Sequence, residues 1–347
     1  MRLRTSLIKE SSGALNNGSV YVTMEPVITA RNLQKTFDNG VKAVQGLDIE
    51  IFEGEVFGFL GPNGAGKSTS INMFTGIMKP TDGKLQIMDL EIPKDISKLP
   101  NYIGYVPQNL VFYDHLTVYE NLMLFARAYK ISNPSKRVEE LISLLQLDEI
   151  RNRQAQHMSG GQKRRLNLAI GLLHSPKILF LDEPSAGMDP QSRNVLWKTV
   201  ETLAQNDGIT IILTTHLMET ADRLADRIAI IDKGVIQIID TPENLKKQYG
   251  KGDVIELEIN KELDESELNS LGAALNKEWP DFVFQTNHSF KISVGNGVTS
   301  ISKILDTVDS TIGRINLSQL SMRENTLEDV FITITGSKLR EGGKNHE

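Results

Sequence analysis

The sequence predicts an α/β fold built on a parallel sheet, with a smaller α+β domain after it. An apolar run over 56–60 leads into a glycine-rich loop, and residues 68–77 after that loop have a helical pattern. Residues 177–181 and 208–213 are apolar without alternation, which is typical of parallel strands buried on both faces. Beyond residue 250 the pattern changes to short alternating strands and helices. These observations indicate one large domain followed by a small one.

Length and composition narrow the class of protein. A chain of 347 residues exceeds one typical domain of about 100–200 residues. The net charge of −6 and the pI of about 5.7, without a long basic tract, make nucleic acid an unexpected partner. The sequence has no cysteine, which excludes disulfides and Cys-ligated zinc. No apolar run approaches the roughly 18 residues that span a bilayer, so we expect a soluble polypeptide.

Composition also suggests the domain boundaries. Residues 1–23 hold basic residues and then Ser, Gly and Asn without an apolar core, which does not fit a signal peptide. Met24 is a second possible start. The expected units are a disordered extension over 1–25, the large domain over 26–250 with an inserted helical subdomain at about 111–173, a second domain over 253–337, and a flexible tail over 338–347.

The loop after the first buried strand has the pattern G-x-x-x-x-G-K-[ST], which cradles phosphate. Its glycines let backbone N–H groups approach phosphate oxygens, and the N-terminus of the following helix adds partial positive charge. Lys67 would reach the β- and γ-phosphates, and the Ser68 hydroxyl would ligate Mg²⁺. An ordinary glycine-rich turn is the alternative, which the complete pattern disfavours. The residues predicted to bind nucleotide here are Gly61, Pro62, Asn63, Gly64, Ala65, Gly66, Lys67, Ser68 and Thr69.

Polar side chains follow the buried apolar strands, where ligands of such sheets bind. Asp182 is placed to hold Mg²⁺ through water, and Glu183 to orient and deprotonate an attacking water. A solvated acidic loop is the alternative. His216 ends another strand and is either a capped histidine or a contact of the γ-phosphate, the second being favoured. A further strand over 103–107 runs into Gln108.

Two segments are ambiguous when each is taken alone. Residues 26–53 alternate in short runs, which suggests a small antiparallel sheet. Phe37 in that sheet is either a stacking surface for a nucleobase or a partly buried strand aromatic, and the second is favoured. Residues 117–173 have helical spacing, and within them the segment MSGGQ at 158–162 opens a helix. An N-capping serine followed by two glycines makes a second anion site, although Ser-Gly-Gly by itself is only a loop.

Taken together, these motifs resemble the nucleotide-binding subunit of ABC transporters over about residues 27–250. In chain order the matched motifs are Walker A at 61–68, the Q-loop glutamine Gln108, the signature at 158–162, Walker B at 178–182 with the catalytic glutamate Glu183, the D-loop at 185–189 and the H-loop histidine His216. The resemblance assigns Phe37 to adenine stacking, against the reading favoured above. Met158 and Met188 replace the commoner Leu in the signature and D-loop, and both keep an apolar side chain of similar volume.

The resemblance implies an ATPase that works as a head-to-tail homodimer with ATP and Mg²⁺. Each ATP then lies between Walker A of one subunit and the signature of the other, and the dimer opens when hydrolysis removes the γ-phosphate. The residues implied to act across the dimer are Ser159, Gly160, Gly161, Gln162 and, in the D-loop, Asp189. The implied metal ligands are Ser68, Gln108 and, through water, Asp182, and the implied catalytic residues are Glu183, His216 and Gln108.

Residues after 253 predict a separate small domain. Residues 254–259 alternate as a half-buried strand, a helix starts near Asp264, two short strands follow, and then a helix over 298–308 and a last strand over 314–320. The order βαββαβ is ferredoxin-like. This segment has no titratable cluster or metal spacing, so a regulatory or dimer-supporting role is expected. Another helix begins at Thr326.

The ending TLEDVF and the stretch SRNVLW resemble the drug-exporter branch of the family, of the daunorubicin-resistance type. This implies the motor subunit of an exporter, coupling ATP binding, dimerisation and hydrolysis to transport through separate transmembrane permease subunits on the cytoplasmic side of the cell membrane. One alternative is the motor of an importer. Another is a cytosolic ABC ATPase acting in DNA maintenance or on the ribosome, which the short separation of Lys67 from Ser159, the single phosphate loop and the lack of cysteine disfavour. The cargo is not indicated by a motor subunit.

Overall fold

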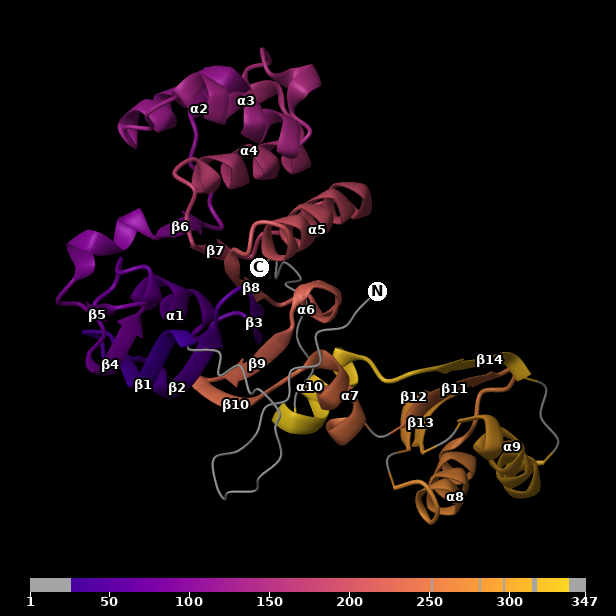
Figure 1. Cartoon of the computed structure of the whole chain (residues 1–347). Helices are drawn as coiled ribbons and strands as arrows, with labels where there is room; N and C mark the ends of the chain where they lie inside the picture. Colours follow the sequence, from indigo (N-terminus) through magenta and orange to yellow (C-terminus); the bar gives the residue numbers. More distant parts are fainter. Residues whose placement is uncertain (1–25, 251, 281, 296, 314–316, 337–347) are drawn as a thin grey trace, which may run out of the picture.

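The computed structural model describes residues 26–336 apart from 251, 281, 296 and 314–316, and within them the chain forms three sheets with helices between them (Figure 1). The predicted extension over 1–25 and the predicted tail over 338–347 lie outside the described residues. Among the described residues, no helix is both long enough and apolar enough to cross a membrane.

The central sheet has the strand order β10-β9-β3-β8-β7-β6. Its strands are β3 (Val56–Leu60), β6 (Ile103–Val106), β7 (Ile178–Asp182), β8 (Thr210–Thr215), β9 (Arg227–Asp232) and β10 (Val235–Asp240). All pairings are parallel except that of β10 with β9. Every residue of β3, β7 and β8 is buried, which confirms the prediction of parallel strands covered on both faces.

One face of this sheet packs against α1 (Lys67–Phe74) and the antiparallel sheet. That sheet has the order β2-β1-β4-β5, with β1 (Pro26–Thr36), β2 (Lys42–Phe52), β4 (Asp82–Ile87) and β5 (Leu90–Ile92). A single cluster joins these elements: it contains Ile178 and Phe180 of β7, Phe74 of α1 and Ile28 of β1. A short 3₁₀ helix, η1 (Ile96–Asn101), follows β5. The predicted antiparallel sheet near the N-terminus is therefore present, and it is completed by strands that follow α1.

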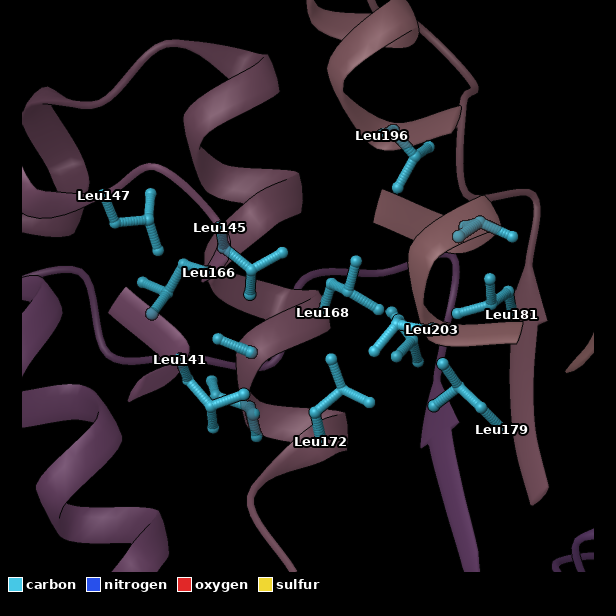
Figure 2. Packing of buried hydrophobic residues seen from close by; sticks show 14 of the residues in the cluster. Leu141, Leu145, Leu147, Leu166, Leu168, Leu172, Leu179, Leu181, Leu196 and Leu203 are labelled. Carbon is cyan, nitrogen blue, oxygen red and sulfur yellow. The ribbon is translucent and has the colours of Figure 1, made fainter. Parts of the chain in front are cut away.

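The other face is covered by the helical block and by the helix after β7. These elements are α2 (Val118–Ala128), α3 (Pro134–Leu144), the short η2 (Asp148–Ile150) and η3 (Ala155–His157), α4 (Gly160–Leu172) and α5 (Pro190–Gln205). Figure 2 shows that Leu168 and Leu172 of α4 lie between Leu141 and Leu145 on one side and Leu179, Leu181 and Leu203 on the other. The apolar cluster is thus continuous from the helical block to the sheet. Two further helices, α6 (Met218–Leu224) and α7 (Pro242–Tyr249), flank β9 and β10 along the chain.

The C-terminal unit contains β11 (Asp253–Ile259), α8 (Glu265–Asn276), β12 (Val283–Thr286), β13 (Ser289–Val294), α9 (Gly297–Ile312) and β14 (Leu317–Arg323). Its sheet has the order β12-β13-β11-β14, and all pairings are antiparallel. The element order βαββαβ is the one that the sequence predicts, with a core of its own that includes Leu257, Leu271, Phe290 and Ile304. The last strand ends later than predicted, and 314–316 lie outside the described residues.

The last helix, α10 (Leu327–Thr335), leaves the C-terminal unit and packs against the first unit (Figure 1). Leu327, Val330 and Phe331 share a buried cluster with Leu60 of β3 and Leu245 of α7. By its contacts α10 therefore belongs with the first unit, although the sequence analysis assigns its residues to the segment 253–337.

Asp329 joins α10 to the C-terminal unit. Its carboxylate accepts hydrogen bonds from Lys291 of β13 (2.6 Å), from Arg323 of β14 (2.7 Å) and from the N–H of Thr326 (3.0 Å). Burial raises the pKa of this carboxyl, but the hydrogen bonds from Arg323 and Lys291 outweigh burial and hold the pKa well below its usual range. The ionised carboxylate is the form that these contacts stabilise.

We expect Asp329→Asn to lower the free energy of unfolding at pH 7 by about 1–3 kcal/mol, because charge-assisted hydrogen bonds are lost from a partly buried group. Since the folded pKa is lowered, the contribution is complete above the unfolded value of about 3.9 and is lost as the pH falls through the folded value. Urea unfolding from pH 7 downwards measures the difference from the wild-type chain, which should stay constant to about pH 5 and then shrink. The exposed neighbour Glu328→Gln is the control. Equal stabilities at pH 7 would contradict the role of this carboxylate.

Candidate functional site

The predicted phosphate loop lies between β3 and α1, where the sequence places it. Two of its glycines leave no room for a side chain. A Cβ on Gly61 would collide with the carbonyl oxygen of Ile231, and one on Gly66 with that of Ala43. Gly66 also has a φ of +103°, which L side chains rarely adopt. The loop is therefore held close against neighbouring backbone, and its shape depends on glycine at these positions.

Lys67 is enclosed at the start of α1, with 5% of its surface exposed. Its ammonium donates to the carbonyl oxygens of Gly61 (2.7 Å) and Pro62 (3.1 Å), so the loop wraps around the side chain. Oε1 of Glu183 lies 3.4 Å from the same nitrogen. Burial lowers the pKa of Lys67, and the charge of Glu183 opposes this effect. The lysine is thus aimed at the inside of the loop and has a negative partner in the residue that follows β7.

Asp182 is the last residue of β7 and receives two hydroxyl hydrogen bonds. Ser68 Oγ donates to Asp182 Oδ1 over 3.0 Å, and Thr214 Oγ1 donates to the same oxygen over 2.5 Å. Thr214 is the direct cross-strand neighbour of Asp182 in the pairing of β7 with β8, so the sheet register brings the two together. The carboxylate is 5% exposed, and its position is set from both sides.

Glu183 follows β7 with a φ of +49°, a left-handed conformation that is costly for a residue with a side chain. Its N–H donates to Thr214, to Oγ1 at 3.0 Å and to the carbonyl at 3.2 Å, which holds this conformation in place. Oε2 lies 2.9 Å from Nδ1 of His216, which follows β8. Oε1 accepts no hydrogen bond from the described part of the chain. One carboxylate oxygen is therefore oriented by His216, while the other has a free lone pair at the site.

Two groups near this site were missed by the sequence analysis. The sequence analysis assigns no role to Thr214, yet its single hydroxyl links Asp182 and Glu183. Its position at the carboxyl end of the neighbouring strand was the available signal. The pKa of Tyr105 is raised to about 12 by burial and by the charge of Asp182, and its hydroxyl donates to Asn72 Oδ1 over 3.4 Å. Nothing in the local pattern around Tyr105 indicates this.

The structure unites some of the predicted site residues and leaves others apart. Lys67, Ser68, Asp182, Glu183 and His216 form one connected set. In the described residues, no hydrogen bond or ion pair joins that set to the other predicted positions, which are Phe37, Gln108, Ser159, Gly160, Gly161, Gln162 and Asp189.

The signature residues and Asp189 lie at the N-termini of two helices. Ser159 caps α4 and forms a capping box with Gln162, and Asp189 caps α5. Ser159 and Gly160 are exposed, while Gly161 packs so closely on α5 that a Cβ would collide with Ser192. The N-terminus of α4 is therefore a rigid, exposed surface of backbone N–H groups.

The oxygens of Ser68 and Asp182 fit a divalent cation bound together with a phosphate. Hydroxyl and carboxylate oxygens are the ligands that Mg²⁺ prefers, and Mg²⁺ keeps several water or phosphate ligands. Within the described ranges, no group of three or more His, Asp or Glu side chains could hold a metal ion alone. The donor set thus suits a metal that arrives with its nucleotide.

Comparisons with known proteins agree with this geometry. Residues 44–186 match the family described as ABC transporter. The linearmycin resistance ATP-binding protein LnrL of Bacillus subtilis is 34% identical over 320 residues, which cover 91% of this chain and 100% of that protein. ABC transporter A family member 8 of Arabidopsis thaliana is 35% identical over 321 residues, 90% of this chain and 35% of that protein. The chain thus spans the whole bacterial relative and about a third of the plant one.

Solved structures show the same fold. CbiO1 from Clostridium perfringens, described as part of the ABC transporter complex cbiONQ, matches with a TM-score of 0.61 and 29% identity, over 65% of this chain and 92% of that one. The ATP-binding cassette MJ0796, in a dimeric post-hydrolysis state bound to ADP and Pi, matches with a TM-score of 0.57 and 26% identity, over 62% of this chain and 98% of that one. With a full-length relative at this identity and the same cassette in solved structures, the chain belongs to the family of ABC transporter ATP-binding proteins, which bind and hydrolyse ATP.

Proposed function

We propose that this ABC ATPase is the motor subunit of an exporter, acting as a head-to-tail homodimer with ATP and Mg²⁺ on the cytoplasmic side of a membrane. The observation that carries the proposal is the division of the predicted site. Lys67, Asp182 and Glu183 meet at the end of the central sheet, whereas Ser159 and Gly160 at the start of α4 are exposed and, in the described part of the chain, not hydrogen-bonded to them. A second copy can supply the missing half.

The proposed reaction uses the chain's own groups in defined roles. The Lys67 ammonium, now shared between loop carbonyls and Glu183, would bind the β- and γ-phosphates. Glu183, with Oε2 held by His216, would accept the proton of the attacking water on Oε1. Ser68 and Asp182 would hold Mg²⁺, which neutralises charge on the phosphates. The left-handed backbone at Glu183 keeps the carboxylate aimed at the loop.

Export is favoured by the relatives, and a permease partner by a feature of the surface. The full-length bacterial relative is described as a linearmycin resistance ATP-binding protein, and its match extends beyond the cassette into the C-terminal unit. Directly after Gln108, the side chains of Leu110, Val111 and Tyr113 are 39%, 41% and 58% exposed. We infer that this exposed apolar loop contacts a transmembrane permease subunit, because clustered exposed apolar side chains mark contact surfaces.

The C-terminal unit is proposed to regulate or support the dimer. It holds its own core, and α10 links it to the buried cluster under the phosphate loop. A regulatory or dimer-supporting role predicts that deletion of 253–347 leaves ATP binding intact. That deletion also removes Leu327, Val330 and Phe331 from their cluster with Leu60, so a role of this unit is better tested by point variants.

We expect Glu183→Gln to lower the turnover number for ATP by about 10²–10⁴-fold, because the amide cannot accept a proton from water. ATP binding and ATP-dependent dimerisation should survive. Phosphate release and sedimentation of the purified chain measure the two effects. Glu53→Gln, on the exposed turn before β3, is the control and should hydrolyse ATP at the wild-type rate. An unchanged rate of ATP hydrolysis in Glu183→Gln would contradict the assignment of Glu183 as the general base.

Phe37 is proposed to stack on the adenine, since its side chain is 37% exposed and therefore accessible to a base. We expect Phe37→Ala to raise the dissociation constant for ATP by about 5-fold to 100-fold, the usual worth of base stacking on an aromatic ring. Phe37→Trp should bind ATP like the wild type. Isothermal titration in the Glu183→Gln background measures both. Equal affinities for Phe37→Ala and Phe37→Trp would assign the ring to the strand alone.

The membrane partner can be captured directly. Tagged Glu183→Gln protein, recovered from detergent-solubilised membranes of its own cells with ATP and Mg²⁺, should bring down a polytopic membrane protein. Tyr113→Glu in the same background should abolish recovery, whereas Ile77→Glu, at a side chain 64% exposed outside this loop, should not. Recovery of soluble partners, ribosomes or nucleic acid alone would instead support a cytosolic ABC ATPase.

A further inference from the structure

The loop that carries Gln108 is hydrogen-bonded to the signature helix α4. Arg164 Nη1 donates to the carbonyl oxygen of Gln108 over 2.5 Å. Asn167 Nδ2 donates to the carbonyl oxygen of Pro107 over 3.2 Å, and Asn167 Oδ1 accepts from the N–H of Val111 over 3.0 Å. Two side chains of one helix thus hold the backbone of this loop at three residues.

Both side chains are well placed to act as one clamp. Residues three apart on a helix lie on the same face, so Arg164 and Asn167 reach the loop from neighbouring turns. Asn167 is 1% exposed, and both ends of its amide are used by the loop. The helix itself is fixed, because Leu166, Leu168 and Leu172 are packed in the continuous leucine cluster (Figure 2). The clamp is therefore rigid on its helix side.

The loop that the clamp holds, between β6 and α2, has little regular structure of its own. β6 ends at Val106 and α2 begins at Val118, and Gln108 lies near the start of this connection. The later part of the connection is held by Asn121 of α2, which accepts from the N–H of Tyr113 (2.8 Å) and donates to its carbonyl (3.0 Å). Both halves of this connection are therefore hydrogen-bonded to helices of the helical block.

The same arginine interacts electrostatically with the two carboxylates at the end of β7. Burial lowers the pKa of the Arg164 guanidinium, and the negative charges of Glu183 and Asp182 oppose that effect. Arg164 is four residues after Gly160, where α4 begins, a little more than one helical turn.

We propose that Arg164 and Asn167 are positioning residues that make α4 and the Gln108 loop one rigid piece. This inference rests on the proposed function, in which the start of α4 docks on the nucleotide held by a partner subunit. Docking of α4 at one nucleotide then sets the position of Gln108 at the other, so the clamp couples the two ATP sites of the dimer. Neither residue touches the nucleotide in this scheme.

The test is a double-mutant cycle in the full-length chain. Arg164→Met keeps the apolar stem and removes the donor, and it should lower kcat by about 10-fold to 100-fold through misplacement of Gln108. The dissociation constant for ATP should change less than about 2-fold, and the Hill coefficient for ATP should fall towards one. Arg164→Lys, which can still donate to one carbonyl, should restore most of kcat. Lys163→Met, one position along α4, is the control and should behave as wild type.

Gln108→Ala separates positioning from direct action. Because it removes the side chain that the clamp positions, Arg164→Met should cost nothing further in the Gln108→Ala background. Additive losses would overturn the proposal by showing that Arg164 acts on the reaction itself, as would an unchanged kcat and Hill coefficient in Arg164→Met. Asn167→Ala is the second variant and should lower kcat in the same way, with no additional loss when combined with Arg164→Met. A Glu183→Gln chain that binds ATP but stays monomeric would defeat the proposed head-to-tail dimer instead, so the two failures are distinguishable.

Discussion

The buried ion pair of Lys67 and Glu183 is the constraint on which the rest of the site depends. Both side chains are 5% exposed, and charges removed from water are costly unless each one is well hydrogen-bonded. The carbonyls of Gly61 and Pro62 satisfy the ammonium, which fixes the loop. His216 and the left-handed backbone hold the carboxylate, and both depend on the ends of β7 and β8. A sheet buried on both faces is what makes those strand ends immobile enough for this purpose.

Much of the fold was predictable because the informative patterns are local. The phosphate loop, the two-carboxylate strand end and the apolar strands each depend on residues adjacent in the chain, and the βαββαβ order follows from spacing alone. Thr214, Asn167 and Arg164 were missed because their roles arise from register and packing. The pairing of β7 with β8 brings Thr214 to Asp182, and the position of α4 brings Asn167 to the loop. The packing of α10 on the first unit also depends on a contact distant in sequence.

Two buried asparagines of the helical block fix loop backbone in the same way. Asn121 and Asn167 are 0% and 1% exposed, and each spends its amide on loop backbone rather than on another side chain. Such groups add little net stability, but an alternative loop conformation would leave them unpaired in an apolar surrounding. They therefore specify one arrangement of the connection between β6 and α2. The leucine cluster provides the stability, and the asparagine amides determine the conformation of the connection.

The contacts of α10 determine how the C-terminal unit is attached to the first unit. That unit is an insertion, because the chain leaves the first unit after α7 and returns to it at α10. The two connections lie side by side, with the Asn325 amide donating to the carbonyl of Gly252. A body attached by two adjacent connections can rotate about the line that joins them but cannot swing freely as one on a single linker does. The adjacent connections and the contacts of Asp329 with Lys291 and Arg323 thus tie this unit to the helix that packs beneath the phosphate loop.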